Sequence, residues 1–564
     1  MSSTELTLRP FFWRATKLFP EKEVVSRGPD GMTHYTYREF GERARKLAGA
    51  LSALGVEPGD RVGTVGWNTH RHYEAYFAIP LMGAQLHTIN AVLPDDHVEY
   101  IVEDAGDEVL LVDPGEPFET VERLWDRFDG VREVIVLDDH VPETELDCVT
   151  AYEAFVADAD PVEWPDLSED QPAGMCYTSG TTGKPKGVEY TQKMIYSHAM
   201  MVATPSALGV DESDVVMHVV PMYHVNSWEL PFSTAMAGAK QVYPGPSPDA
   251  ETLARLIEEE GVTLTAGVPT VWINLLDYLD DHDVDISSLE RIVVGGSAAP
   301  SAVMRRFEDD YDVTIEHAWG MTETMSIGSV SRPKSGMREW DREQRFEKRA
   351  KQGLLSPGME MKLVGDDGEE VPWDGETAGE LYVRGPTVVD EYYNRPEANE
   401  GSFEDGWLKT GDIAVVDGDG YLELVDRAKD VIKSGGEWIS SIELENALLE
   451  HDGVLEAAVI GVPHERWRER PVACVQRKPG GSLSADDVLA FLGERYPRWW
   501  LPDNVVFVEE VPKTATGKFD KKQLRDEYGD ADLPYAPGEG EKTGDEREAE
   551  DAASGETPAS DGDR

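Results

Sequence analysis

Apolar residues between Thr36 and Gly55 recur with the three- and four-residue spacing of one helix face. This stripe consists of Phe40, Ala44, Leu47, Ala48, Leu51 and Leu54. Thr36 and Glu39 have the spacing of a capping box, and Gly55 is the residue type that most often ends a helix. The pattern therefore predicts an amphipathic helix between Thr36 and Gly55.

Short runs rich in β-branched residues follow this helix and are separated by segments of helical period. The runs lie at residues 61–65, 109–113, 134–137, 263–267 and 291–294. Strands that alternate with helices are typical of layered α/β folds, so we expect an α/β fold for most of the chain. Residues 338–351 alternate in charge and are interpreted as a solvated helix or as an excursion of the chain on the surface. No catalytic or binding role is assigned to them.

The pattern changes after Gly411. Residues 415–416, the Asp-Gly-Asp-Gly turn at 417–420 and residues 421–425 predict a β-hairpin. A smaller unit is expected beyond the hairpin. It has a helix at about 441–449, strands at 457–462 and 472–477, and a second helix capped by Ser484 with Asp487 three residues later.

These elements predict a domain organisation. A chain of 564 residues is too long for one ordinary core, and we expect a large N-terminal domain over residues 1–426. A small α+β domain of about 100 residues, a normal domain size, is expected over 427–535. Residues 536–564 form an acidic tail with almost no large apolar side chain, and we expect it to be disordered.

The chain is strongly acidic, with 110 acidic against 52 basic residues and a formal net charge of −58. A surface of this sign repels phosphate backbones, which disfavours nucleic acid as a partner. Salt at 1 M shortens the Debye length to about 3 Å and screens the self-repulsion. A salt-rich cytosol is therefore expected, and an acidic surface that serves only solubility is the alternative.

Cysteine content and hydropathy bear on the compartment. The three cysteines, Cys148, Cys176 and Cys474, are too scattered for a disulfide framework or a zinc site. No apolar run approaches the roughly 18 residues of a membrane span, and the N-terminal residues do not resemble a signal peptide. We expect an unsecreted, cytoplasmic protein.

The segment 177–187, Tyr-Thr-Ser-Gly-Thr-Thr-Gly-Lys-Pro-Lys-Gly, combines hydroxyls, glycines and lysines. Glycines let backbone N–H groups approach phosphate oxygens, and lysine neutralises their charge. A Walker loop is disfavoured because only two residues separate Gly180 from Gly183 and Pro185 follows Lys184. The segment predicts a phosphate-binding loop, and a Gly/Ser-rich surface turn is the alternative.

Six further motifs follow in order. They are Pro-Met-Tyr-His-Val-Asn at 221–226, Gly-Gly-Ser-Ala-Ala-Pro at 295–300, Trp-Gly-Met-Thr-Glu at 319–323, Thr-Gly-Asp at 410–412, Asp-Arg-Ala-Lys-Asp at 426–430 and Lys-Thr-Ala-Thr-Gly-Lys at 513–518. With the phosphate loop they resemble the adenylate-forming superfamily of acyl-CoA synthetases, luciferases and peptide-synthetase adenylation domains. The resemblance implies a large N-terminal domain of several subdomains and a small mobile C-terminal domain.

The resemblance also implies a nucleotide site. Thr178 and Glu323 are expected near a magnesium ion, Thr322 at the α-phosphate, and Asp412 with Arg427 at the ribose. Residues implied around the triphosphate and adenine are Ser179, Gly180, Thr181, Thr182, Gly183, Lys186, Gly295, Gly296, Ser297, Trp319 and Gly320. Trp319 replaces the family's commoner tyrosine, which leaves stacking possible but changes the phenolic hydrogen bond. Turn capping by Asp412, a surface ion pair of Arg427, a core role for Trp319 and a simple tight turn at 295–297 remain alternatives.

In the family, a lysine at the position of Lys518 bridges the carboxylate and phosphate oxygens. A hinge at the position of Lys429 then reorients the small domain for the second half-reaction. After that rotation a segment implied to form the thiol channel faces the adenylate; it contains Lys433, Ser434, Gly435, Gly436 and Trp438. A solvated lysine among Lys513, Lys521 and Lys522 is the alternative for Lys518.

The branch that the sequence resembles most, through residues 221–228, 269–272 and 432–440, is the medium- and long-chain fatty acyl-CoA synthetases. It implies ATP, Mg2+ and coenzyme A as cofactors and dimerisation through the N-terminal part. His224, Val225, Asn226 and Trp228 are implied at the acyl pocket. Trp228 is either a gate or core packing, and His224 either lines the pocket and turns with the substrate or is a core histidine.

The implied reaction is the conversion of a carboxylate and ATP to acyl-AMP and pyrophosphate, followed by transfer of the acyl group to CoA. The alternatives are an aryl- or short-chain acid CoA ligase, transfer to a carrier protein, and a non-catalytic acyl- or nucleotide-binding protein.

Overall fold

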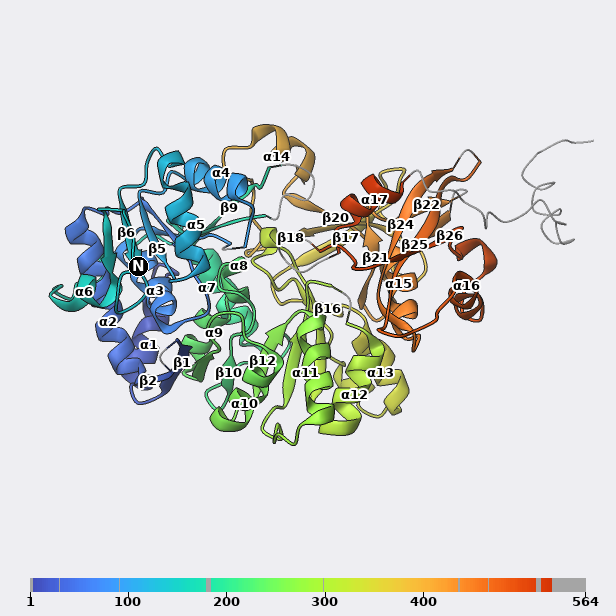
Figure 1. Cartoon of the computed structure of the whole chain (residues 1–564), viewed down its shortest axis with the longest axis horizontal. Helices are drawn as coiled ribbons and strands as arrows, with labels where there is room; N and C mark the ends of the chain where they lie inside the picture. The colour runs from blue at the N-terminus through green and yellow to red at the C-terminus, as the bar shows by residue number, and fades with distance from the viewer. Residues whose placement is uncertain are drawn as a thin grey trace, which may run out of the picture. The chain divides into compact units, whose positions relative to one another are not determined.

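A computed structural model describes residues 4–29, 31–90, 92–178, 184–297, 299–434, 437–464, 466–513 and 519–529, with only the backbone of Glu437 and Trp438. The predicted tail, 536–564, lies outside the described residues. The chain divides into two compact units (Figure 1). The larger comprises Met1–Lys429 and Lys513–Phe519, and the smaller comprises Asp430–Pro512 and Asp520–Arg564.

A seven-stranded sheet organises the first part of the larger unit. Its order is β7-β6-β5-β3-β4-β8-β9, and all pairs are parallel except β8 with β9. The strands are β3 (Arg61–Val65), β4 (Gln85–Thr88), β5 (Val109–Val112), β6 (Glu133–Val136), β7 (Val149–Ala151), β8 (Pro172–Tyr177) and β9 (Gly187–Thr191). The predicted strands at 61–65, 109–113 and 134–137 are confirmed to within one residue. These runs are apolar because helices cover both faces of a parallel sheet.

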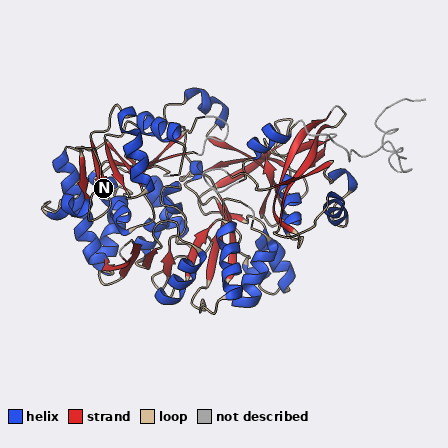
Figure 2. Cartoon of the chain, in the orientation of Figure 1, coloured by secondary structure: helices blue, strands red, loops and turns tan. Residues whose placement is uncertain are grey.

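A nine-stranded sheet of order β16-β15-β14-β13-β12-β10-β11-β1-β2 follows. The run from β14 to β1 is parallel, and the outer pairs are antiparallel. The strands are β1 (Glu23–Gly28), β2 (Gly31–Thr36), β10 (Val215–Met217), β11 (Lys240–Tyr243), β12 (Leu264–Gly267), β13 (Arg291–Val294), β14 (Thr314–Trp319), β15 (Ser329–Val330) and β16 (Leu354–Leu355). The strands predicted at 263–267 and 291–294 are confirmed here, and with the surrounding helices (Figure 2) so is the α/β fold class.

The helices of the larger unit pack around these two sheets, except the last one, which packs on residues 403–416. They are α1 (Arg9–Leu18), α2 (Tyr37–Leu54), α3 (His70–Met82), α4 (Asp95–Ala105), α5 (Glu116–Leu124), α6 (Tyr152–Ala157), α7 (Gln192–Val202), α8 (Val225–Trp228), α9 (Leu230–Ala237), α10 (Ala250–Glu260), α11 (Pro269–Asp281), α12 (Ser301–Tyr311), α13 (Arg342–Ala350) and α14 (Pro396–Ser402). One hydrophobic cluster contains Phe40 of α2, Phe77 of α3, Leu86 of β4 and Val216 of β10. The two sheets therefore share a core.

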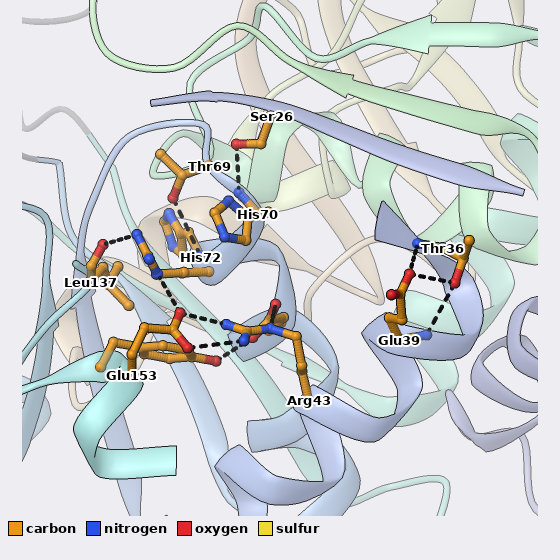
Figure 3. Close-up of polar contacts among 12 residues, drawn as sticks. Ser26, Thr36, Glu39, Arg43, Thr69, His70, His72, Leu137 and Glu153 are labelled. Carbon is orange, nitrogen blue, oxygen red and sulfur yellow. Dashed lines mark hydrogen bonds and ion pairs between the residues drawn. The ribbon is translucent and has the colours of Figure 1, made fainter. Parts of the chain in front are cut away.

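The predicted capping box of α2 is confirmed. Thr36 N donates to Glu39 Oε2 at 2.7 Å, and Glu39 N donates to Thr36 Oγ1 at 3.3 Å (Figure 3). Gly55 follows the helix with φ 100°, a left-handed conformation that suits glycine. The apolar stripe from Phe40 to Leu51 is fully buried, as its spacing predicts.

Ion pairs connect α2, α3 and α6. Glu153 of α6 accepts from Arg43 of α2 at 2.8 and 3.0 Å and from Arg71 of α3 at 2.9 Å (Figure 3). Burial alone raises the pKa of Glu153, but the two guanidinium groups outweigh it and lower that pKa to about 2. This carboxylate therefore stays charged and holds three helices together.

A third, antiparallel sheet contains the predicted hairpin. Its strands are β17 (Glu360–Val364), β18 (Gly379–Arg384), β19 (Phe403–Glu404), β20 (Trp407–Val416) and β21 (Leu422–Arg427). Val416 of β20 pairs with Leu422 of β21, which confirms the hairpin.

The helix expected within 338–351 exists as α13, but its interpretation as solvated is wrong for one face. Phe346 and Arg349 are buried, and Lys348 Nζ lies 2.7 Å from Asp417 Oδ2 in the hairpin turn. The charges of this segment are thus partly used for packing, which alternation alone does not reveal.

The smaller unit has the predicted α+β composition. It contains β22 (Ile432–Ser434), β23 (Glu437–Ile439), β24 (Val454–His464), β25 (Arg468–Arg477), β26 (Asn504–Val508), α15 (Ser441–Leu449), α16 (Ala485–Gly493) and α17 (Lys521–Tyr528). The predicted capping box at Ser484 and Asp487 is present. Short 3-10 helices in the two units are η1 (Trp125–Arg127), η2 (Thr322–Thr324), η3 (Ser335–Met337) and η4 (Arg498–Trp500). No helix in the described part of the chain is both long and apolar enough to cross a bilayer.

Candidate active site

Several predicted site residues lie where parallel strands end. Thr178 directly follows β8, Gly295 follows β13, and Trp319 is the last residue of β14. Ligands of open α/β sheets bind beyond the carboxyl ends of the strands, because the loops there are free to vary while the sheet stays rigid. These residues thus lie at the carboxyl ends of strands of both large sheets, where a nucleotide is expected to bind.

The base of the phosphate loop is closed by two hydrogen bonds that extend the β8–β9 ladder. Thr178 N donates to Lys186 O at 2.9 Å, and Lys186 N donates to Thr178 Oγ1 at 3.2 Å. The loop members between them, Ser179, Gly180, Thr181, Thr182 and Gly183, lie outside the described residues. The ladder brings both ends of the loop to one point.

Tyr392 joins two charged groups of the site. Its hydroxyl donates to Glu323 Oε1 at 2.5 Å, and Lys186 Nζ lies 3.8 Å from its ring centroid. Burial, and then the Glu323 charge, raise the pKa of Tyr392, so it stays a hydrogen-bond donor. Burial lowers the pKa of Lys186, which the Glu323 charge opposes. Tyr392 is not predicted from the sequence, because nothing in its loop distinguishes it from a packing aromatic.

The turn η2 carries Thr322 and Glu323 and is held from two sides. The Tyr190 hydroxyl of β9 donates to Thr322 O at 2.8 Å, and Val389 N donates to Glu323 O at 3.0 Å. Tyr190 is not predicted from the sequence either. These contacts place the Glu323 carboxyl, which is 6 % exposed, beside the phosphate-loop lysine.

Asp412 and Arg427 form a cross-strand pair of β20 and β21. Arg427 Nε lies 2.9 Å from Asp412 Oδ1, and Trp319 Nε1 donates to Asp412 Oδ2 at 2.9 Å. Asp412 is therefore a buried strand residue and not a turn cap, and Arg427 pairs with a buried carboxylate while its own side chain is 39 % exposed. The indole N–H of Trp319 thus supplies a polar contact to this buried carboxylate.

Two glycines of the expected adenine region are required by their surroundings. A Cβ on Gly320 would lie 1.2 Å from Ser326 O, and Gly296 has φ 83°, in the left-handed region. Ser297 follows in the same turn. A Cβ on Gly295 would lie 3.0 Å from Trp228 Cη2, so this turn packs directly on the expected acyl-pocket tryptophan.

The expected acyl-pocket residues lie beside the phosphate loop. Thr178 and His224 line one small hollow together with Thr88, Ile89, Asn90, Leu93, Ile101, Tyr177 and Tyr223. Val225, Asn226 and Trp228 are buried in the turn that follows His224. Trp228 is 7 % exposed, and its role as a gate or as core packing stays a prediction. A second hollow, lined by Phe11, Tyr196 and Met200, contains none of the predicted site residues.

Three more predicted residues are described by the structure. Lys429 is the last residue of the first segment of the larger unit, whereas Lys433 and Ser434 belong to β22 of the smaller unit. Lys433 N donates to Glu469 Oε2 at 2.9 Å, and Arg470 Nη1 donates to Ser434 Oγ at 3.0 Å. The predicted residues Gly435, Gly436 and Lys518, and the side chain of Trp438, lie outside the described residues.

Comparisons with known proteins agree with this architecture. The family model of the AMP-binding enzymes matches residues 12–393, and that of the AMP-binding enzyme C-terminal domain matches 443–518. A long-chain-fatty-acid–CoA ligase of Thermus thermophilus is 45 % identical over 533 residues, which is 94 % of this chain and 96 % of that protein. A medium-chain-fatty-acid–CoA ligase of Ectopseudomonas oleovorans is 38 % identical over 535 residues, with coverages of 94 % and 97 %.

Among solved structures, the anthranilate CoA ligase AuaEII in complex with anthranoyl-AMP superposes with a TM-score of 0.83. It is 28 % identical, and the match covers 92 % of this chain and 97 % of that one. The chain therefore belongs to the AMP-binding enzymes of the adenylate-forming superfamily, near the fatty acyl-CoA synthetases.

Proposed function

We propose that this chain is an AMP-forming acyl-CoA synthetase whose acid is a medium- or long-chain fatty acid. The observation that carries the proposal is that three sets of residues of the larger unit are connected by contacts. They are the ends of the phosphate loop, the carboxylate expected near magnesium, and the residues expected at the ribose. Thr178 and Lys186 are linked through Tyr392 to Glu323, and Trp319, three residues before Thr322, contacts Asp412. The fatty-acid ligases at 45 % and 38 % identity support the choice of acid.

In the first half-reaction a carboxylate oxygen of the acid attacks the α-phosphorus of ATP, and the bond to pyrophosphate breaks. The main task of the protein is to position two anions and to stabilise the charge on the leaving group. We assign the binding of the triphosphate to Lys186 and the backbone of the phosphate loop. Contact with the α-phosphate is assigned to Thr322, which precedes Glu323 in the chain. We assign to Lys518 the bridging of carboxylate and phosphate oxygens.

The ribose is proposed to bind at Asp412. Each carboxylate oxygen accepts one bond from protein, from Arg427 or Trp319, and a carboxylate oxygen has a second acceptor position. Both ribose hydroxyls can therefore donate to Asp412 when the exposed Arg427 side chain shifts. Trp319, rather than a phenol, then provides the aromatic surface for adenine.

The residues present fit a magnesium ion. Thr178 and Glu323 offer hard oxygen ligands, and Mg2+ in phosphoryl-transfer sites is held by one or two protein oxygens together with phosphates and water. Among the described residues there is no group of three or more His, Cys, Asp or Glu side chains that forms a full cation cage. The ion would neutralise charge on the phosphate oxygens.

In the second half-reaction the thiolate of CoA attacks the acyl carbonyl, and AMP leaves with the electron pair of the broken C–O bond. We propose that rotation about Lys429 exchanges Lys518 for the Lys433–Trp438 segment. Within the smaller unit Ser434 is held by Arg470, whose guanidinium is buried and paired with Asp503 at 2.7 Å. The strand that leads into Gly435 and Gly436 thus has a rigid support.

The acid is tested with ATP, magnesium and a panel of acetate, octanoate, palmitate and benzoate in the absence of CoA. We expect pyrophosphate release to be fastest with octanoate or palmitate. Fastest release with acetate or benzoate would favour the short-chain or aryl alternative. No release with any acid, from low to multimolar KCl, would contradict the enzymatic function and favour a binding protein. Supplying CoA or a carrier protein afterwards distinguishes the acceptors.

Two further features belong to this proposal. We propose that the acidic chain works in a salt-rich cytosol, because high salt screens its net charge of −58, and that it forms a homodimer through the larger unit. Light scattering coupled to size exclusion at about 2 M KCl, where screening is nearly complete, tests the dimer; a monomer mass at all protein concentrations would contradict it.

A further inference from the structure

The turn that follows His224 has an unusual backbone. Val225, Asn226, Ser227, Trp228 and Glu229 have φ values of 45°, 50°, 55°, 53° and 59°. None of them is glycine, and L-residues disfavour the left-handed region because Cβ approaches the carbonyl oxygen. Such conformations persist only where the surroundings determine them, and they often occur at functional sites. The contacts that hold this turn are therefore informative.

Asn226 is the centre of those contacts. Its Nδ2 donates to Glu229 Oε1 at 2.9 Å, and its Oδ1 accepts from Thr88 Oγ1 at 3.1 Å and from Cys176 Sγ at 3.4 Å. Gly174 makes room for the amide, because a Cβ there would lie 3.3 Å from Asn226 Nδ2. Residues of β4 and β8 thus hold the turn through one side chain.

Glu229 is fully buried and no cation pairs with it in the described part of the chain. Its Oε2 has no hydrogen-bond partner among the described residues. Burial raises the pKa of Glu229 to about 8, which the bond from Asn226 only partly opposes. The titratable groups that face it are Cys176 of β8, Tyr76 of α3 and Tyr190 of β9, and burial raises the pKa of all three. At neutral pH this carboxyl is therefore uncharged.

Two paths lead from the turn to the expected nucleotide site. The Cys176 thiol lies near the Tyr190 hydroxyl, which donates to Thr322 O at 2.8 Å. In addition, Trp228 packs on Gly295 of the glycine turn. A change in the turn can thus reach Thr322 and Gly295 through direct contacts.

We propose that Glu229 is a positioning residue that holds the left-handed turn and thereby couples acid binding to nucleotide binding. The inference rests on the proposed function, because it takes the turn as part of the acid site. Glu229 touches neither substrate; it acts through Asn226 on the turn and through Cys176 and Tyr190 on Thr322.

The test measures the dissociation constant of α,β-methylene-ATP by calorimetry with and without octanoate. We expect the acid to tighten binding by about fivefold or more in the wild type at about pH 6.5, within the usual range of coupling. E229L should reduce this factor to less than about twofold. E229Q should keep it, because glutamine retains an oxygen for Asn226 Nδ2.

A pH series separates positioning from a general loss of stability. The wild type should lose coupling between about pH 7 and about pH 9, as Glu229 ionises, whereas E229Q should not. The control E74Q alters another buried carboxyl, in the Arg43–Tyr152 cluster, and should lower the melting temperature without changing the coupling. If E229L does not fold, Y190F provides the same test, because it removes only the bond to Thr322.

Three results would overturn the inference. They are a coupling factor in E229L or Y190F within about twofold of the wild type, no coupling in the wild type, and identical pH curves for the wild type and E229Q. The same wild-type preparation is assayed for acyl-AMP. A wild type that forms no acyl-AMP contradicts the proposed function, whereas an active wild type with unchanged coupling in the variants contradicts only the role of Glu229.

Discussion

At the scale of single residues, the hydroxyl and the ring of Tyr392 have separate roles in the candidate site. The hydroxyl orients Glu323, and the ring faces the Lys186 ammonium. Outer contacts of this kind fix the geometry of a carboxylate that holds a metal, the role proposed for Glu323, and their loss usually costs about 10- to 100-fold in affinity or activity. The motif residues themselves could be predicted from sequence, but Tyr392 could not, because its partners lie about 70 and 200 residues away and meet it only through the fold.

Y392F should lower the rate of pyrophosphate release by about 10-fold or more and raise the magnesium concentration needed for half-maximal rate. The ring remains under Lys186, so the effect isolates the bond to Glu323. Y393F is the matched control, because the neighbouring ring lies at 4.4 Å from Arg61 and does not contact Glu323. Wild-type magnesium dependence in Y392F would refute the assignment.

At the scale of elements, hydrophobic periodicity predicts what depends on local pattern. α2, β3 and β13 are found where the pattern places them, because capping residues and β-branched runs act locally. The left-handed turn at Val225–Glu229 could not be predicted, since it contains no glycine and is imposed by side chains of β4 and β8. The buried face of α13 could not be predicted either, because it depends on distant residues. Lys348 of α13 pairs with Asp417, which lies in a hairpin far along the chain.

The helix cluster around Glu153 has a predictable acid dependence. Its folded pKa of about 2 lies below the unfolded value of about 4.3. The stabilisation is therefore fully present above about pH 4.5 and is lost as the pH falls toward 2. E153Q should lower the melting temperature at about pH 7 by several degrees, and the difference from wild type should shrink steadily below about pH 4.

E163Q is the control for that series, because the Glu163 side chain is 95 % exposed and its distance to Arg45, 3.5 Å, is long for an ion pair. It should leave the melting temperature nearly unchanged, as exposed ion pairs contribute little. A melting-temperature difference for E153Q that does not vary between about pH 7 and about pH 3 would mean that the lost interaction is not the ionised pair.

At the scale of the whole molecule, the net charge of −58 is the dominant feature. Repulsion among like charges falls as the Debye length shortens from about 10 Å at 0.1 M to about 3 Å at 1 M salt. We expect the melting temperature to rise as KCl is raised from about 0.1 M to about 2 M, with most of the rise below about 1 M. A flat or falling curve would contradict the proposed salt-rich habitat.

We propose that the two half-reactions use different parts of the C-terminal domain, whose family model matches residues 443–518 and so includes Lys518. Replacing Lys518 with alanine should reduce acyl-AMP formation by about 100-fold or more, the usual contribution of one preorganised charge, but spare thioester formation from supplied acyl-AMP. Replacing Gly435 with a bulky residue should do the reverse. Equal losses in both half-reactions for both variants would contradict the proposed rotation about Lys429.

The central claim is that the acid passes through an acyl-adenylate, and an isotope measurement tests it most directly. Octanoate labelled with 18O in both carboxylate oxygens is incubated with ATP, magnesium and CoA, and the nucleotide product is analysed by mass spectrometry. Attack of the carboxylate on the α-phosphorus predicts AMP that carries one 18O atom per turnover. Unlabelled AMP, or ADP with labelled phosphate, would contradict the account.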